Sequence, residues 1–167
     1  MTLAFCQHCS KYSAWVDKKM IYPASSTAPM PSPDMPDEVK ADYLEARDVF
    51  EKSPRSAGGL LRIAFEKLLP HVGATKSNPN DAIGELVKKG LSLTEQQALD
   101  VMRVFANQSA HNGFVKLEDQ PATVGFLFNL LNYIVGWMIT RPKQIQSMFG
   151  SLPPDKVAGI EKRDGKK

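Results

Sequence analysis

Three polar residues, Arg103, Asn107 and His111, recur every four residues along one predicted helix. At about 100° per residue, this spacing places them within roughly 80° of one another on one face. A histidine near a helix C-terminus interacts favourably with the helix dipole when it is protonated, which suits a general acid or base near neutral pH. An arginine on the same face can hold a phosphate. The other interpretation is an ordinary solvated face, with His111 as a C-capping residue and Arg103 paired with Asp100 or Glu66.

Two further basic residues, Arg55 and Arg62, are seven positions apart on another predicted helix and therefore share a face. One interpretation is a surface that contacts the phosphates of a nucleic acid. The other is an ion pair between Arg62 and Glu66, four residues later. The spacing favours the ion pair for Arg62 and leaves the role of Arg55 open.

The sequence contains two cysteines, Cys6 and Cys9. Two thiolates across a tight turn that leads into a hairpin are typical of half of a zinc knuckle, and a structural zinc site needs four ligands. The missing ligands would come from His8, from His71 or His111 in the helical region, or from a second chain. The alternatives are a metal-free remnant of such a site and a redox pair, although a reactive dithiol usually opens a helix.

The elements that must position these residues follow from prolines, glycines and hydrophobic periodicity. Residues 1–22 predict a small β-hairpin with the zinc-knuckle-like turn. Residues 23–36 contain five prolines and are expected to form a stiff, extended connector. Residues 37–150 predict five helices packed as a bundle, and residues 151–167 predict a flexible tail. The predicted fold class is therefore all-α, a five-helix bundle preceded by a small β element.

Capping and helix-breaking residues set the expected limits of the helices. Ser53, which a proline follows, predicts the start of the second helix, and Ser92 with Glu95 fits a capping box that opens the fourth. Asn80 is the predicted cap of the third helix. Pro142 is expected to end the fifth helix, because proline lacks the N–H that a helix interior requires.

Composition limits the class of protein. A length of 167 residues suits one domain with a sizeable core, and the apolar fraction of 43% excludes wholesale disorder. The net charge of +3 is too small to indicate a nucleic-acid binder by itself. Residues 120–140 carry no charge and are long enough to cross a bilayer, but Asn129 and Asn132 favour a buried core helix. With no apolar signal sequence near the N-terminus, we expect a cytoplasmic protein without a membrane span.

Three runs of sequence, residues 53–57, 60–68 and 103–113, carry a family resemblance. An all-α bundle whose penultimate helix ends in residues 107–111 resembles the HEPN superfamily (higher eukaryotes and prokaryotes nucleotide-binding). More specifically, the chain is similar to a bacterial domain of unknown function that is found in restriction and other defence proteins. The resemblance covers about residues 34–145.

The resemblance implies metal-independent RNA cleavage, as in catalytic HEPN members. Two subunits pair so that an arginine and a histidine from each line one composite cleft, where the 2′-hydroxyl attacks the adjacent phosphate and leaves a cyclic phosphate. His111 matches the motif histidine and Asn107 the polar residue four positions before it. Arg103 lies one residue farther from the histidine than the motif arginine does, and the positions that satisfy the motif hold Val104, Phe105 and Ala106. Other members are inactive and act as dimerisation or RNA-binding modules.

We therefore expect a homodimeric HEPN-like protein of a defence, anti-defence or toxin system that binds RNA or a nucleotide. As a metal-independent endoribonuclease, it would use His111 as acid or base, Arg103 to stabilise transition-state charge and Asn107 to orient them. The alternative is a non-catalytic module that dimerises and docks a larger protein partner, and a third interpretation is a nucleotide sensor. The displaced arginine favours the module, whereas the asparagine and histidine favour contact with RNA or a nucleotide. Structural zinc at Cys6 and Cys9 is the one cofactor that the sequence suggests.

Overall fold

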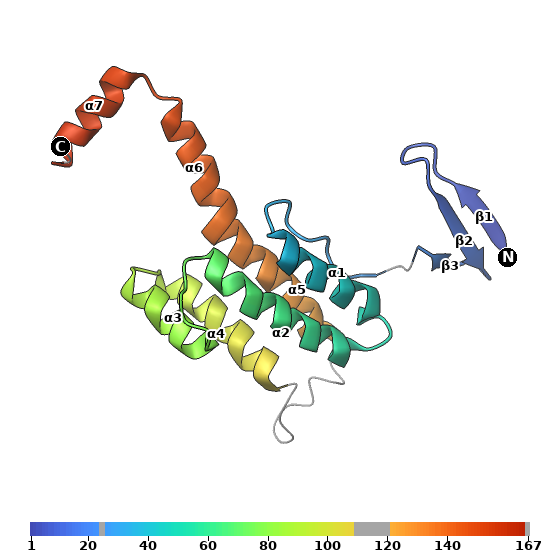
Figure 1. The fold of residues 1–167 in the computed structure, drawn as a ribbon. Helices are drawn as coiled ribbons and strands as arrows, with labels where there is room; N and C mark the ends of the chain where they lie inside the picture. Colours follow the sequence, from blue (N-terminus) through green and yellow to red (C-terminus); the bar gives the residue numbers. More distant parts are fainter. Residues whose placement is uncertain (24–25, 109–120, 166–167) are drawn as a thin grey trace.

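The computed structural model describes residues 1–23, 26–108 and 121–165, with side chains left out of the description at residues 106–108. The described chain is mostly helical and carries a small three-stranded sheet at its N-terminus (Figure 1). Helices in the body of the molecule are α1 (Asp37–Phe50), α2 (Pro54–His71), α3 (Pro79–Lys88), α4 (Leu93–Gln108) and α5 (Pro121–Val135). Beyond them, α6 (Arg141–Gly150) projects from the body and α7 (Pro154–Arg163) follows it.

The N-terminal sheet has three antiparallel strands, one more than the predicted hairpin. They are β1 (Thr2–Phe5), β2 (Tyr12–Val16) and β3 (Lys19–Tyr22), in the order β1-β2-β3. Asp17 and Lys18, which connect β2 to β3, both have positive φ, as a tight hairpin turn requires. The sequence analysis expected two strands in this segment and missed β1.

The predicted caps begin two of the helices as expected. The Ser53 hydroxyl accepts a hydrogen bond from the Ser56 N–H at the start of α2. Ser92 and Glu95 exchange the two hydrogen bonds of a capping box at the start of α4. The predicted cap of α3 was wrong, because Asn78 and not Asn80 caps that helix. Pro79 occupies the first helical position, where its fixed φ suits the helix, and this moves the cap to the residue before it.

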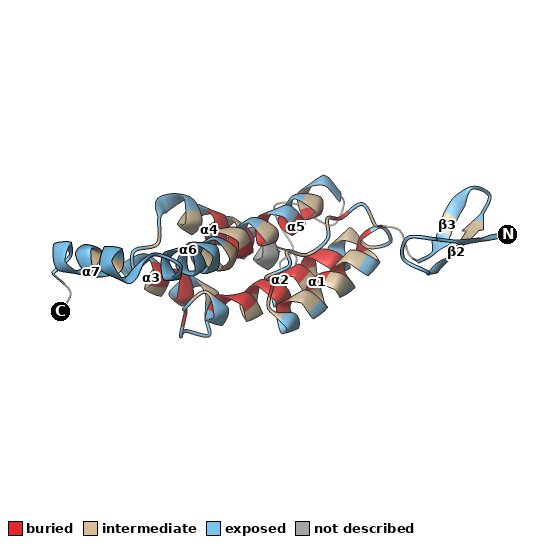
Figure 2. Cartoon of the chain, turned by 90° about the horizontal axis from the view of Figure 1, so that it is seen from above, coloured by how far each residue is buried: buried red, intermediate tan, exposed pale blue. Residues whose placement is uncertain are grey.

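Buried residues lie on the faces that the helices turn toward one another (Figure 2). On α1, the apolar residues Val39, Tyr43, Ala46 and Phe50 recur at helical spacing and are buried. On α5, seven of fifteen residues are buried, which explains the long uncharged run as a core helix. By length and composition alone, the helix Pro121–Gly150 could also cross a membrane.

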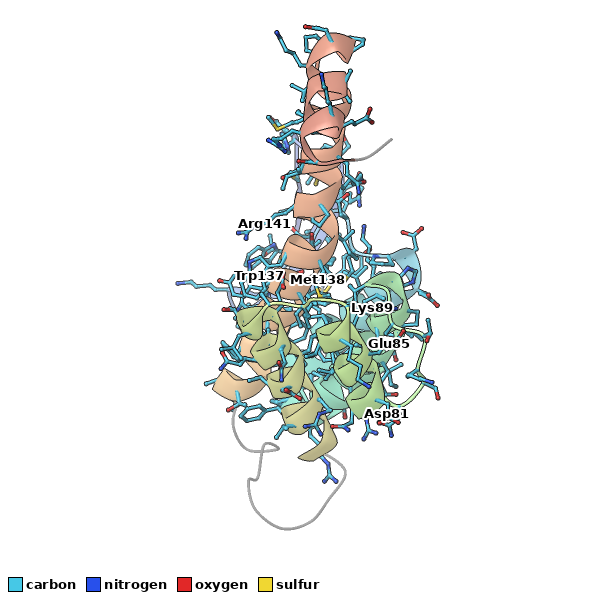
Figure 3. The ribbon with its side chains drawn as sticks, turned by 90° about the vertical axis from the view of Figure 1, so that its left-hand side faces the viewer. Asp81, Glu85, Lys89, Trp137, Met138 and Arg141 are labelled. Atoms are coloured by element: carbon cyan, nitrogen blue, oxygen red, sulfur yellow. The ribbon has the colours of Figure 1, made fainter. Side chains whose placement is uncertain are left out.

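The long C-terminal helix does not end at Pro142, so this prediction was wrong. After α5 the chain makes a π-helical turn (Gly136–Thr140) and continues directly into α6, with Pro142 near its start. The Arg141 N–H bonds to the Gly136 carbonyl, five residues back, and this wider turn accommodates a residue that cannot donate. Figure 3 shows Trp137 and Met138 where the helix leaves the bundle and Arg141 on the projecting part.

The segment predicted as a flexible tail contains α7. Its signals are weak ones that act only at helix ends: Pro154 at the first position, Asp155 in the first turn, and Lys162 and Arg163 in the last turn. No residue of α7 is buried, so packing gives no further support to this helix.

The proline-rich connector crosses the bundle as an extended segment, residues 26–36, which we call the strap. Ala28 and Met35 of the strap are buried in the core. The Asn132 side chain of α5 accepts a hydrogen bond from the Ser32 N–H at 2.8 Å and donates one to the Met30 carbonyl at 2.9 Å. The strap is therefore held in place by specific contacts as well as by the stiffness of proline.

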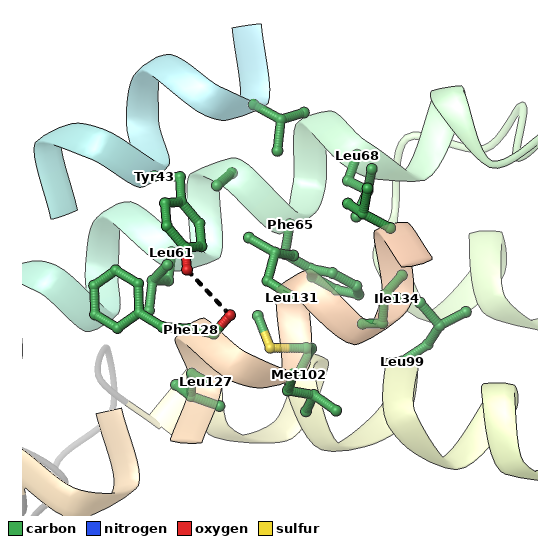
Figure 4. Close-up of a cluster of buried hydrophobic side chains, with 14 of the residues drawn as sticks. Tyr43, Leu61, Phe65, Leu68, Leu99, Met102, Leu127, Phe128, Leu131 and Ile134 are labelled. Carbon is green, nitrogen blue, oxygen red and sulfur yellow. Dashed lines mark hydrogen bonds between the residues drawn. The ribbon is translucent and has the colours of Figure 1, made fainter. Parts of the chain in front are cut away.

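Tyr43 lies where α1, α5 and the strap meet. Its hydroxyl is within hydrogen-bond distance of the Pro29 carbonyl (3.1 Å) and the Phe128 carbonyl (3.4 Å), and it accepts from Asn132 at 3.0 Å (Figure 4). Burial raises the pKa of Tyr43 well above its usual range. The Tyr43 ring also packs edge-on against Phe128, with ring centroids 5.1 Å apart. This cluster joins the strap to the hydrophobic core.

Candidate functional site

Arg103, the first of the predicted site residues along α4, lies on the half-exposed face of that helix. Ala98, Leu99 and Met102 are buried, which turns Asp100 and Arg103 away from the core. Arg103 Nε donates to Asp100 Oδ1 at 3.3 Å, and the two side chains are 27% and 38% exposed. The ion pair of the ordinary interpretation is therefore present.

The rest of the predicted α4 site is only partly described. Asn107 lies in the last turn of α4, but its side chain is outside the description. His111 lies outside the described residues. The structure consequently places the arginine of the site, while the roles predicted for the asparagine and the histidine stay predictions.

The two arginines of α2 differ in their surroundings. Arg62 Nε donates to Glu66 Oε1 at 2.9 Å, which is the ion pair that the spacing favoured. Arg55 is exposed in the first turn of α2.

Three helix ends meet on one side of the bundle. Pro54 and Pro121 line the same pocket, so the N-terminal ends of α2 and α5 are neighbours. In Figure 1, α4 runs antiparallel to α2 and ends on the same side. Neither α2 nor α5 has an acidic residue in its first turn. The partial positive charges of both N-termini are therefore not offset from within their own helices.

The pocket between these helix starts and the strap was missed by the sequence analysis. It has a volume of about 560 Å³ and a mainly apolar lining, in which strap residues face the end of α1 and the start of α5. A Cβ on Gly125 would lie 3.7 Å from the Phe50 ring, so the glycine keeps this part of the pocket open. Because the lining comes from segments about 100 residues apart, no local pattern could have indicated it.

Glu51 is the acidic residue that lines this pocket. Its carboxylate accepts hydrogen bonds from the Thr27 hydroxyl at 2.6 Å and the Thr27 N–H at 2.7 Å. These two bonds hold the pKa of Glu51 below its usual value. The carboxylate is thus already occupied in tying the strap to the end of α1.

Cys6 and Cys9 are both exposed in the turn between β1 and β2 and do not form a disulfide. They approach to 3.5 Å. The pKa of the Cys6 thiol is lowered by hydrogen bonds from the Cys9 backbone N–H, the Cys9 side chain and the His8 backbone N–H. Within the part of the chain that the structure describes, no group of three or more possible ligand residues comes together. His71, one of the predicted zinc ligands, instead pairs with Glu38 at 2.7 Å.

Comparison with known proteins identifies a family for the helical region and leaves its activity open. No curated protein and no solved structure matches the chain. Residues 44–161, from within α1 to within α7, match a family described as a domain of unknown function, DUF4145. This match covers most of the chain, and the β sheet and the strap precede it. The chain therefore belongs to the DUF4145 family.

Proposed function

We propose that this chain is a cytoplasmic, homodimeric HEPN-like protein of a bacterial defence, anti-defence or toxin system that binds RNA or a nucleotide. We further propose that it cleaves RNA without a metal ion through a composite cleft. His111 would act as acid or base, Arg103 would stabilise the charge of the transition state, and Asn107 would orient one of the two.

The observation that carries this proposal is the meeting of three helix ends on one side of the bundle. The N-termini of α2 and α5 lie beside the same pocket, and the partial positive charge of such helix ends favours phosphate groups. Arg55 adds a full positive charge to the first turn of α2. The helix that leads toward His111 ends on the same side. An anionic ligand is therefore the one that this side of the molecule suits best.

The ion pair between Arg103 and Asp100 is compatible with this role. Both side chains are partly exposed, and pairs of this kind contribute only about 0–1 kcal/mol in water. A phosphate that offers two oxygen atoms to the guanidinium would replace a single contact of 3.3 Å at little energetic cost.

The test is cleavage of mixed cellular RNA in the presence of EDTA by the wild type, His111→Ala and His71→Ala. His71→Ala is the matched control, because this histidine lies at the opposite end of α2 and pairs with Glu38. We expect cleavage by the wild type and the control, and none by His111→Ala. Absence of cleavage by a folded wild-type dimer would contradict the ribonuclease proposal. Cleavage that disappears with EDTA would contradict the metal-independent mechanism.

A second candidate function is a non-catalytic module for dimerisation or for binding a protein partner. It is favoured by α6, which projects from the body with Ile145, Met148 and Phe149 exposed. In this case, the wild type and His111→Ala would both leave RNA intact. Truncation before Arg141 would then abolish the dimer or partner complex while leaving the bundle folded.

A further inference from the structure

The N-terminal sheet has no core of its own. Not one of residues 1–23, all of which the structure describes, is buried. Six large apolar side chains are more than half exposed: Met1, Leu3, Phe5, Tyr12, Ile21 and Tyr22. Folded units of this size usually depend on a disulfide, a metal ion or a partner chain for stability. We therefore expect a disulfide, a metal ion or a partner chain to stabilise the sheet.

Four of these side chains, Leu3, Phe5, Tyr12 and Tyr22, gather on one face. Phe5 pairs with Tyr12 across β1 and β2, and Ala14 pairs with both Leu3 and Tyr22. Directly opposed residues, and residues two apart on a strand, share a face of a sheet. The Phe5 and Tyr12 rings are in contact, with centroids 5.1 Å apart. This apolar face of the sheet adjoins the turn that carries the cysteines.

The turn brings the two cysteines together. Cys6 and Cys9 approach to 3.5 Å, which is close enough for both thiolates to bind one zinc ion at about 2.3 Å. The loop is closed by two backbone bonds of 2.9 Å, from the Ser10 N–H to the Cys6 carbonyl and from the Cys6 N–H to the Lys11 carbonyl. Ser10 takes a left-handed conformation, with φ of 54°, that turns the chain back into β2. The turn is therefore already arranged for two of the four ligands of a structural zinc site.

We propose that two copies of this chain share one zinc ion, which Cys6 and Cys9 of each copy bind as four thiolates. Four ligands are needed, and the described part of the chain offers no third one near the pair. A two-fold axis through the ion supplies the second pair from an identical turn. The same pairing lets the apolar faces of the two sheets cover one another.

Charge favours this composition of the site. Zinc with four thiolates carries a charge of −2, because each thiol releases its proton on binding. Lys11 closes the cysteine turn, so each copy of the chain places one positive charge beside the anionic centre.

The experiment measures zinc per chain by elemental analysis in full-length protein purified under reducing conditions, together with its mass in solution. We expect about 0.5 zinc per chain in a dimer, with a shell of four sulfur atoms in X-ray absorption spectra. Cys6→Ser and Cys9→Ser should each abolish zinc retention. His8→Ala, the matched control in the same turn, should retain it. The melting temperature of the helical bundle reports that the serine variants remain folded.

Three results would overturn the inference: no zinc in the reduced protein, one zinc per chain in a monomer, or loss of zinc in His8→Ala. The inference does not rest on the proposed function, and the two can fail separately. Zinc stoichiometry tests the shared site, whereas RNA cleavage in EDTA tests the helical cleft. A chelated protein that remains a dimer while it cleaves RNA would show that the helices pair on their own.

Discussion

Replacement of Asn132 by leucine should detach the strap while leaving the apolar core of α5 intact. The Asn132 side chain makes three hydrogen bonds, to the Ser32 N–H (2.8 Å), the Met30 carbonyl (2.9 Å) and the Tyr43 hydroxyl (3.0 Å). Leucine has a similar volume but can make none of them. The strap would then keep its proline stiffness and lose its attachment to the helix.

The size of the effect follows from these three contacts. Each hydrogen bond contributes about 1 kcal/mol net, so their loss lowers the free energy of unfolding by about 3 kcal/mol. Partial burial of the leucine side chain returns about 1 kcal/mol. The expected destabilisation is therefore about 2 kcal/mol. For a chain of this size, that loss lowers the melting temperature by about 4–8 °C.

Calorimetry and hydrogen exchange at the Ser32 amide measure the two consequences. Asn129→Leu is the control, since its exposed side chain bonds to the Gly125 carbonyl of the same helix. We expect it to change stability by no more than about 0.5 kcal/mol. The Ser32 amide should exchange faster in Asn132→Leu alone. Equal melting temperatures for the two variants, or unchanged exchange at Ser32, would refute the reasoning.

Two further predictions concern the core and the pH dependence of stability. Phe128→Ala should lower the free energy of unfolding by about 3–5 kcal/mol in denaturant titrations, because its side chain is fully buried. Phe126→Ala, at a half-exposed position, should lower it far less. Equal losses of stability in the two variants would contradict this assignment of the core. On α3, the Lys89 side chain and the Thr75 N–H lower the pKa of Glu85 from 4.5 to about 2 (Figure 3). A depressed folded-state pKa stabilises the protein above the unfolded value, so this contribution should fade as the pH falls from about 4.5 toward 2. Glu85→Gln should remove that part of the pH dependence in thermal melts, and parallel wild-type and variant curves would argue against it.

The parts of the fold that the sequence predicts well are those set by contacts within a few residues. The stripe from Val39 to Phe50 is buried because its spacing matches the helical repeat. Ser53 and Ser92 begin their helices because each hydroxyl bonds to a backbone N–H three residues later. The ion pairs of Arg62 and Arg103 are also local, four and three residues apart, and their spacing favoured or allowed them in advance.

The features that the sequence analysis missed depend on contacts between distant segments. Ser32 and Asn132 are 100 residues apart, so no window of the sequence relates them. The pocket beside Gly125 is formed by the same strap and was missed for the same reason. Proline rules failed at Pro142 because they assume an α-helical turn, whereas the preceding turn is wider.

The candidate site was predictable from the sequence only in part. Its arginine was placed on a face of α4 by periodicity, and the structure finds it there, half-exposed and paired. The partner surface that would complete a composite cleft belongs to a second copy, and the pattern of one chain carries no information about its position. The neighbouring helix starts at Pro54 and Pro121 became apparent only once the packing of α2 and α5 was known.

Because of the π-helical turn between α5 and α6, the direction in which α6 presents its side chains can change without a change in the packing of α5. A continuous α-helix would couple the two. The π-helical turn contains more residues than the roughly 3.6 of an α-helical turn, so it changes the angular phase of every later side chain about the helix axis. None of its five residues is buried. Insertion or deletion of one residue there would rotate the exposed Ile145 and Met148 around the axis by about 100° without moving the buried side chains of α5. The direction in which the projecting helix presents its apolar residues can thus diverge among related proteins while the bundle stays constant.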